Sequence, residues 1–207
     1  MTGRFISLEG GEGVGKSTQA QRLADVLIAR GHDVVLTREP GGSAGAEAIR
    51  ALLLEGAAGR WSAEAEALLF AAARADHVAR TIRPALEAGR WVITDRFLDS
   101  SLAYQGHADG VGEAAIRCLH VIGSADLLPD RTLLLTLPEA EAAARAAARD
   151  RGDADRFGAR DAAYHARVAG AFQALAAAEP ARVRVVDASG PPEIVTGRLL
   201  AALDDPT

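Results

Sequence analysis

Residues 10–17 read Gly10-Gly11-Glu12-Gly13-Val14-Gly15-Lys16-Ser17 and lie between a short apolar run at 4–8 and a helical pattern over 16–30. The stretch matches the eight-residue phosphate-loop pattern at every fixed position, in the strand-loop-helix setting that this pattern requires. Its glycines let backbone N–H groups turn inward around an anion, and the positive end of the following helix points to the same place. The stretch therefore predicts a site for nucleotide phosphates in an α/β fold.

Short apolar runs alternate with longer helical patterns in the rest of the chain, which is typical of a parallel sheet covered by helices on both faces. We expect five strands, at 4–8, 33–37, 91–94, 132–136 and 182–186. We expect helices at 16–30, 45–55, 63–88, 99–123 with a break around Gly110 to Gly112, 138–149, 158–178 and 191–203. The predicted fold is a three-layer α/β sandwich in a single domain, 1–207, with a charged lid at about 149–157.

The composition is that of a soluble globular protein, with 49% hydrophobic residues, 25% charged residues and a formal charge of −5. The negative charge disfavours a nucleic acid as partner. No segment reaches the roughly 18 to 20 apolar residues that cross a bilayer, and the start lacks a signal-peptide pattern. The single cysteine, Cys118, excludes an intrachain disulfide and a cysteine-rich zinc site. We therefore expect a cytoplasmic protein without a membrane partner.

The histidines and the single lysine limit the kinds of metal and nucleotide site that the chain can form. The five histidines show no metal-ligand spacing, and we expect them at the surface or at helix ends: His32, His77, His107, His120 and His165. Lys16 is the only lysine among 23 basic residues. A slim charge on a flexible stem fits between phosphates where a planar guanidinium does not, so Lys16 is a predicted catalytic charge. The chain has no asparagine and no second lysine, which excludes a guanine-reading Asn-Lys-x-Asp segment.

Further polar residues fall at the carboxyl edge of the predicted sheet. Asp95 and Arg96 end the strand at 91–94, and Arg38-Glu39-Pro40-Gly41-Gly42 follows the second strand. Ser17 and Asp95 are the predicted ligands of Mg²⁺. Thr18 is either an ordinary helix residue or a contact of the α-phosphate.

One helix and one loop add further candidates. Phe70 and Arg74 lie one helical turn apart, so they offer a ring for stacking and a guanidinium for a base edge from the same face. The charged loop brings Arg149, Arg151 and Arg156 to a place where a lid could close.

Together these segments resemble the bacterial thymidylate kinase family of P-loop nucleoside monophosphate kinases. The resemblance runs from Phe5 to the C-terminal helix and is carried by residues 5–10, 37–42, 69–74, 95–106 and 186–189. It implies the P-loop NTPase sandwich, transfer of the γ-phosphoryl group of ATP to dTMP with Mg²⁺, and a homodimer.

The resemblance also implies residue roles. Phe70 would stack on thymine, Arg74 would bind its O4, and Tyr104 would lie against the sugar. Glu12 would contact the 3′-hydroxyl of the acceptor. The implied dTMP-binding set is Glu12, Arg38, Glu39, Pro40, Arg50, Phe70, Arg74, Arg96, Ser100, Ser101, Tyr104 and Gln105. The implied ATP-binding set is Gly10, Gly11, Glu12, Gly13, Val14, Gly15, Lys16, Ser17, Thr18, Arg145, Asp187 and Ser189. The implied catalytic set is Lys16, Arg96, Arg149, Arg151 and Arg156.

Each assignment has a plainer alternative. Phe70 and Tyr104 can be core residues, and Arg50 and Arg145 can be solvated helix charges. Two other functions also stay open: a kinase of the same fold with another nucleoside or monophosphate as acceptor, and a non-catalytic nucleotide-binding module. Arg74 and Tyr104 weigh against the first, and the lid arginines with Asp95-Arg96 weigh against the second.

The expected mechanism needs no strong base, because the acceptor is already an anion, and depends on positioning and charge neutralisation. A phosphate loop with an acid at Glu12 contributes no arginine of its own. We therefore predict that Arg149 or Arg151 supplies a guanidinium when the lid closes.

Overall fold

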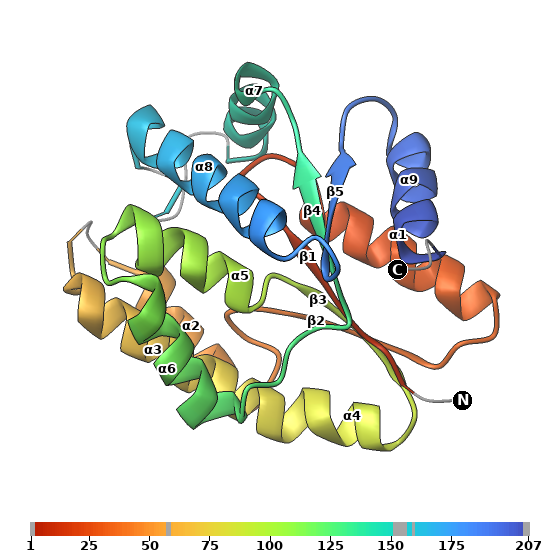
Figure 1. Ribbon diagram of the computed structural model, residues 1–207, viewed down its shortest axis with the longest axis horizontal. Helices are drawn as coiled ribbons and strands as arrows, with labels where there is room; N and C mark the ends of the chain where they lie inside the picture. The colour runs from red at the N-terminus through yellow and green to blue at the C-terminus, as the bar shows by residue number, and fades with distance from the viewer. Residues whose placement is uncertain (1–2, 57–58, 151–156, 159, 205–207) are drawn as a thin grey trace.

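The computed structural model describes residues 3–56, 59–150, 157–158 and 160–204, and of residues 149 and 150 it describes the backbone alone. Five strands form one sheet: β1 (Phe5–Glu9), β2 (Val34–Arg38), β3 (Trp91–Asp95), β4 (Arg131–Thr136) and β5 (Val183–Asp187). All neighbouring strands are parallel, in the order β2-β3-β1-β4-β5 (Figure 1). The predicted five-stranded parallel sheet is confirmed.

Helices surround this sheet. They are α1 (Lys16–Ala29), α2 (Ala44–Leu54), α3 (Ala63–His77), α4 (Arg83–Glu87), α5 (Leu98–Ser101), α6 (Glu113–Ser124), α7 (Glu139–Asp150), α8 (Ala162–Ala178) and α9 (Pro192–Asp204). Two π-helical segments, η1 (Val78–Ile82) and η2 (Leu102–Ala108), lie between α3 and α4 and after α5.

Two predicted helices contain π-helical segments, with the break predicted around Gly110 to Gly112 present between η2 and α6, and a third helix begins later than predicted. The helix predicted at 63–88 is interrupted by η1, which directly precedes Pro84 at the start of α4. Proline lacks an N–H and crowds the carbonyl four residues earlier, so a widened turn relieves the conflict. The helix predicted at 99–123 contains η2, in which the Asp109 N–H donates across five residues to the Tyr104 carbonyl at 2.9 Å. The helix predicted at 158–178 begins at 162, because the Asp161 carboxylate caps it by accepting from the Tyr164 N–H at 2.7 Å.

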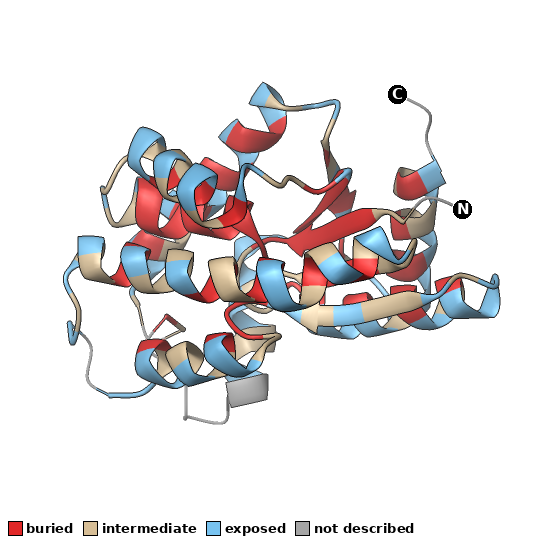
Figure 2. Cartoon of the chain, turned by 90° about the horizontal axis from the view of Figure 1, so that it is seen from below, coloured by how far each residue is buried: buried red, intermediate tan, exposed pale blue. Residues whose placement is uncertain are grey.

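Alternation along β1 separates the two faces of the sheet. Ile6 and Leu8 pack with residues of α1 and α9, whereas Phe5 packs with residues of α3, α5 and α6 on the other face (Figure 1). Ser7 and Glu9 point to the same side as Phe5 and are fully buried. The strands accordingly form the buried centre of the molecule, seen in Figure 2. This central strand places two polar groups directly beneath α5.

The carboxyl ends of the strands meet at one edge of the sheet. Leu8 and Arg38 both pair with Asp95, and Thr136 pairs with Asp187 at the corresponding end. The phosphate loop starts here, after β1. In open parallel sheets this edge is where ligands bind.

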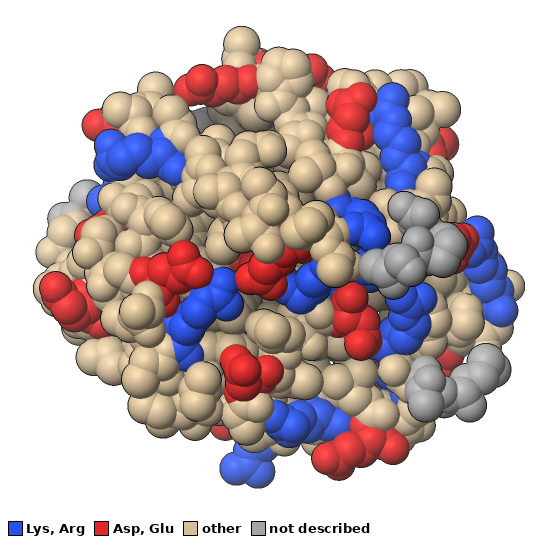
Figure 3. All heavy atoms as spheres, in the orientation of Figure 1, with Lys and Arg blue, Asp and Glu red and all other residues tan. Residues whose placement is uncertain are grey.

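Charges are mixed on the surface. On the face shown in Figure 3, basic and acidic side chains are interspersed. Within the described part of the chain, no helix is both long enough and apolar enough to span a bilayer.

Candidate active site

The phosphate loop connects β1 to α1 in a conformation that its glycines permit. Gly10 has φ +137°, and a side chain there would meet the Leu135 carbonyl oxygen 2.5 Å away. Gly13 has φ +75°, and a side chain there would meet the backbone of Ala142. L-residues with side chains rarely adopt such φ values, and no space is available for a Cβ atom at these two positions. The loop therefore depends on both glycines for its shape.

Lys16 lies inside this loop. Its ammonium donates to the Gly11 carbonyl at 2.6 Å and is nearly fully buried. Burial, and then the neighbouring charge of Arg96, lower the pKa of Lys16 to about 8. The bond to the Gly11 carbonyl holds the ammonium at the inner face of the loop. An oxyanion bound there would raise the pKa of Lys16 again and favour its charged form.

Ser17 and Asp95 are adjacent, as predicted for a metal site. The Ser17 hydroxyl donates to Asp95 Oδ2, and Asp95 Oδ1 is buried without a hydrogen-bond partner among the described residues. A hydroxyl and a carboxylate oxygen with spare acceptor capacity fit Mg²⁺, which is held by one or two carboxylates together with substrate phosphates. The described residues contain no cluster of three or more His, Cys, Asp or Glu that could hold a metal by themselves.

A cavity of about 340 Å³ opens beside the phosphate loop. Its lining residues come from α1, α2, α3, α5, η2 and the segments after β2 and β3: Glu12, Lys16, Ser17, Arg38, Glu39, Pro40, Arg50, Leu54, Phe70, Arg74, Asp95, Arg96, Phe97, Ser100, Ser101, Tyr104, Gln105 and Phe157. Every residue of the predicted dTMP-binding set is among them. The cavity and the phosphate loop share Glu12, Lys16 and Ser17, so a ligand in the cavity would lie directly beside an anion held by the loop.

Arg74 forms one buried wall of this cavity. Its Nε donates to Glu39 Oε2 at 2.8 Å, and its Nη2 donates to the Phe97 carbonyl at 3.1 Å and the Ser101 hydroxyl at 2.8 Å. Its guanidinium carbon lies 5.2 Å from the centre of the Phe97 ring. The remaining group, Nη1, has no hydrogen-bond partner in the described part of the chain. Arg74 thus presents spare donors to the cavity from a fixed plane.

Glu39, a member of the predicted dTMP-binding set, lines the cavity and uses both carboxylate oxygens for bonds within the protein. Oε2 accepts from Arg74 and Oε1 lies 3.0 Å from Nδ1 of His77. Ser100 similarly donates to Glu9 at 2.6 Å and accepts from Arg96 at 3.0 Å. Both residues line the cavity while orienting an arginine within it.

Arg96 connects the cavity to the phosphate loop. Its guanidinium pairs with Glu12 at 2.5 Å and donates to the Gly10 carbonyl at 3.2 Å, and it lies 5.2 Å from the centre of the Tyr104 ring. Its backbone has φ +71°, a left-handed value that is uncommon for a residue with a side chain. The Arg96 N–H donates to the Leu8 carbonyl and the next N–H, of Phe97, donates to Glu9 Oε1 at 2.7 Å. These bonds hold the strained turn.

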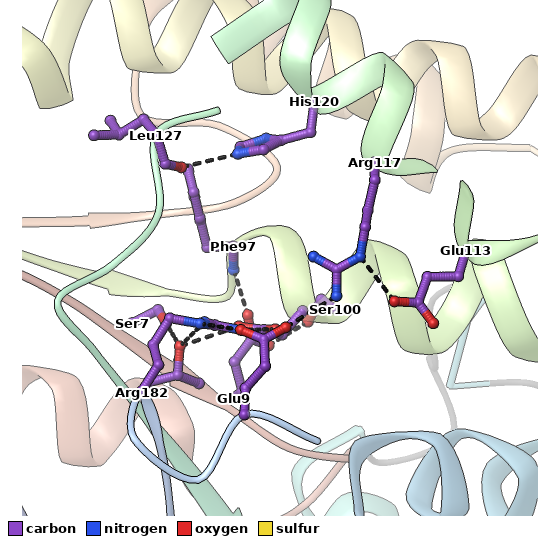
Figure 4. A network of polar contacts seen from close by, with 12 residues as sticks. Ser7, Glu9, Phe97, Ser100, Glu113, Arg117, His120, Leu127 and Arg182 are labelled. Carbon is purple, nitrogen blue, oxygen red and sulfur yellow. Dashed lines mark hydrogen bonds and ion pairs between the residues drawn. The ribbon is translucent and has the colours of Figure 1, made fainter. Parts of the chain in front are cut away.

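A buried polar network extends beneath the site (Figure 4). Arg182 donates through both amino groups to the Asp99 carboxylate, each at 2.7 Å, and Asp99 is 2% exposed. Thr132 connects Asp99 to Ser7 through bonds of 3.0 and 2.8 Å. Burial, and then the negative charge of Asp99, raise the pKa of Glu9 to about 8. The network anchors α5, and with it Ser100, to the strands below.

A second cavity at the phosphate loop, also about 340 Å³, lies on the α9 side. Its lining residues include Gly13 to Gln19 together with Arg145, Ala188, Gly190, Pro192 and Val195. Arg145 pairs with Glu141 at 2.6 Å, and its Nη1 lies 3.4 Å from the Ala188 carbonyl. Asp187 and Ser189 do not line this cavity. They bond to each other, the Ser189 N–H donating to Asp187 Oδ1 at 2.9 Å, and so shape the turn that carries Ala188.

Several predicted residues lie elsewhere. Gly10 and Gly11 line a third cavity, of about 580 Å³, near β4, α7 and α8. The side chain of Arg149, and the whole of Arg151 and Arg156, lie outside the described residues. The contacts predicted for these lid arginines therefore lie outside the described part of the chain.

Sequence reasoning missed several residues of the site. Phe157 follows the charged loop and packs against Phe70 and Tyr104, with ring centres 5.7 and 6.2 Å apart. An aromatic residue inside a charged segment is a signal that could have identified it. The histidines were predicted at the surface or at helix ends; His77 does end α3 but is buried, and His120 is buried within α6. A histidine at a helix end carries no local signal of the partners that bury it.

Comparisons with known proteins agree with this geometry. The sequence model described as thymidylate kinase matches residues 8–198. A thymidylate kinase of Rhizorhabdus wittichii is 69% identical over 205 residues, covering 99% of each chain. One of Gluconobacter oxydans is 51% identical, covering 98% of this chain and 95% of its own.

A solved structure gives the same result. The crystal structure of thymidylate kinase from Ehrlichia chaffeensis is 29% identical and superposes with a TM-score of 0.79, covering 99% of this chain and all of its own. The phosphate loop, the adjoining cavity and these matches over nearly the whole length together establish that the chain belongs to the thymidylate kinase family of ATP-dependent nucleoside monophosphate kinases.

Proposed function

We propose that the protein transfers the γ-phosphoryl group of ATP to thymidine 5′-monophosphate, giving ADP and thymidine 5′-diphosphate for dTTP synthesis. The observation that carries the proposal is Arg74, a buried guanidinium with spare donors at the wall of the cavity beside the phosphate loop. A donor fits the O4 carbonyl of thymine and opposes the amino group that cytosine has at the same place. Phe70 lies in the same cavity, where its ring can stack on the base.

The acceptor's phosphate would lie among Arg38, Arg50 and Arg96, which line the other part of the cavity. Arg50 donates to the Pro40 carbonyl at 2.6 Å, and Arg38 donates to both oxygens of Glu47 at 3.0 and 3.1 Å. These bonds orient the two guanidinium groups, whose positive charge favours phosphate oxygens. Ser101 and Gln105 would approach the base, and Tyr104 would lie against the sugar with Glu12 near its 3′-hydroxyl.

The donor's phosphates would occupy the phosphate loop, with the α9-side cavity taking the remainder of ATP. Arg145 would pack on adenine, with the Asp187-Ala188-Ser189 turn nearby, and Thr18 would lie at the α-phosphate end. Ser17 and Asp95 would hold Mg²⁺, which when bound neutralises charge on the β- and γ-phosphate oxygens. Lys16 would place its ammonium on the same oxygens.

Transfer needs no strong base, since the attacking group is already a phosphate anion. Lys16 and Arg96 supply positive charge from the loop and from the cavity. Further charge would come from Arg149, Arg151 or Arg156, an assignment that rests on the sequence. In related chemistry such an arginine is worth on the order of 10³ in rate.

The protein would act in the cytoplasm as a homodimer, in a single domain with a lid at about 149–157. Leu68 on α3 and Val121 and Ile122 on α6 are apolar and 56%, 53% and 78% exposed. Helices α3 and α6 pack against each other, so these side chains belong to neighbouring surface elements. A second copy of the chain would remove them from water.

An ADP-release assay with ATP, Mg²⁺ and one acceptor at a time tests the proposal. Thymidine 5′-monophosphate should give the highest kcat/KM in a panel that also contains deoxycytidine, deoxyadenosine and deoxyguanosine monophosphates and thymidine. A signal for thymidylate no higher than for deoxycytidylate or thymidine would sink the assignment.

A further inference from the structure

His77 is a fully buried residue at the end of α3 that lines neither nucleotide cavity. Its Nδ1 lies 3.0 Å from Glu39 Oε1, and its Nε2 lies 2.7 Å from the Thr37 hydroxyl. Because an ionised carboxylate only accepts, Nδ1 carries a proton and donates to Glu39. Both ring nitrogens therefore have a hydrogen-bond partner. Thr37 lies near the end of β2, and Glu39 directly follows β2.

Glu39 connects this ring to the cavity. One carboxylate oxygen accepts from His77 and the other accepts from Arg74 Nε at 2.8 Å, so the two donors together fix the plane of the carboxylate. Arg74 then has its plane fixed by Glu39, by the Phe97 carbonyl and by Ser101. The direction of the remaining Arg74 donors depends on all three.

The ring itself has no room to move. A Cβ atom placed on Gly42, which has φ +84°, would lie 2.4 Å from His77 Nε2. The backbone after β2 thus lies directly on the imidazole. Thr81, one helical turn later, donates to the Gly42 carbonyl at 2.7 Å and holds the same backbone without contacting Glu39.

We propose that His77 is a positioning residue for acceptor selectivity: through Glu39 it holds the Arg74 guanidinium in the orientation that distinguishes a carbonyl from an amino group on the acceptor base. This inference rests on the proposed function. A histidine that served packing alone would influence stability and would leave the choice between thymidylate and deoxycytidylate unchanged.

Two amide substitutions of His77 test the two ring nitrogens separately. In His77→Asn the amide nitrogen can take the place of Nδ1 and donate to Glu39, whereas in His77→Gln the amide takes the place of Nε2 and retains only the Thr37 contact. The measured quantity is the ratio of kcat/KM for thymidylate to kcat/KM for deoxycytidylate. Thr81→Val is the matched control, because it removes an anchor of the same backbone and leaves Glu39 and Arg74 untouched.

We expect His77→Gln to lower the ratio about tenfold or more, which is the effect of losing one hydrogen bond to a charged group. The loss should appear mainly as a higher KM for thymidylate, with the KM for ATP unchanged within about twofold. His77→Asn should recover most of the ratio, and Thr81→Val should keep the parent's ratio.

An active His77→Gln variant with the parent's ratio would overturn the inference, as would equal losses in the Asn and Gln variants. Should the Gln variant not fold, Glu39→Gln replaces one acceptor oxygen by a donor and breaks the same His77–Glu39–Arg74 connection from its centre, and an unchanged ratio there would overturn it equally. These outcomes leave the proposed function intact. A parent protein that does not phosphorylate thymidylate would instead overturn the proposed function, and the inference with it.

Discussion

Replacement of Glu9 by glutamine should remove much of the pH dependence of stability near neutrality. Glu9 is fully buried beneath α5, where burial and then Asp99 raise its pKa from 4.5 to about 8. The folded protein therefore binds this proton more tightly than the unfolded chain does, so the free energy of unfolding falls as pH rises from 4.5 towards 8. Between about pH 5 and pH 7.5 Glu9 loses its proton in the unfolded chain and largely keeps it in the folded protein. One pKa unit is worth ~1.4 kcal/mol, so the free energy of unfolding should fall by about 3 kcal/mol over this range.

Glutamine resembles the protonated acid. Its carbonyl can accept from the Phe97 N–H and its amide can donate to Ser100, while nothing titrates. Urea unfolding of the parent and of Glu9→Gln at several pH values between 5 and 8 gives the difference in unfolding free energy, which should shift by about 3 kcal/mol in favour of the variant as pH rises. Glu193→Gln, which removes an exposed carboxylate, is the control for lost charge. Parallel pH profiles for parent and Glu9→Gln would refute this reasoning.

Three further predictions concern the same region. Asp99→Ala removes one of the two carboxylates paired with Arg182 and leaves Glu179 at 2.7 Å, so it should lower the unfolding free energy by about 1.5 to 3 kcal/mol in urea titrations; a loss below about 1 kcal/mol would contradict the importance of this pair. Lys16→Arg should lower kcat by about 10² or more with the circular dichroism spectrum unchanged, because a planar guanidinium does not fit between phosphates; near-parental turnover would be inconsistent with the role given to Lys16. Chelation of divalent cations should abolish turnover and added Mg²⁺ should restore it, and full activity in chelator would argue against the Ser17 and Asp95 site.

Local patterns predicted the sheet, the phosphate loop and some residues of the cavity beside it, whereas others, such as Arg50 and Tyr104, were implied only by the resemblance to thymidylate kinases. Gly10 and Lys16 belong to a motif whose chemistry is contained in eight consecutive residues, and Phe70 and Arg74 share a helix face by spacing alone. Arg38 and Asp95 could be placed at one edge because parallel strands align their carboxyl ends. Sequence spacing decides each of these positions.

The remaining features depend on partners far away in the sequence. The carboxylate of Glu39 that bonds to His77 is 38 residues away, and Phe97, which bonds to Glu9, is 88 residues away. From the sequence alone, His77 is therefore expected at the surface or at a helix end, and Glu9 is not distinguished from any other charged residue next to the phosphate loop. Segment η2 packs against α8, a tertiary contact without a local signal, whereas η1 has a local signal in Pro84.

The transfer of a phosphoryl group to thymidylate is tested most directly by following the phosphate itself. The protein is incubated with ATP labelled in its γ-phosphate, Mg²⁺ and thymidine 5′-monophosphate, and the labelled products are separated. We expect the label in thymidine 5′-diphosphate, with one ADP formed for each labelled molecule. Label released as inorganic phosphate, or retained in ATP while thymidylate is unchanged, would contradict the proposed function.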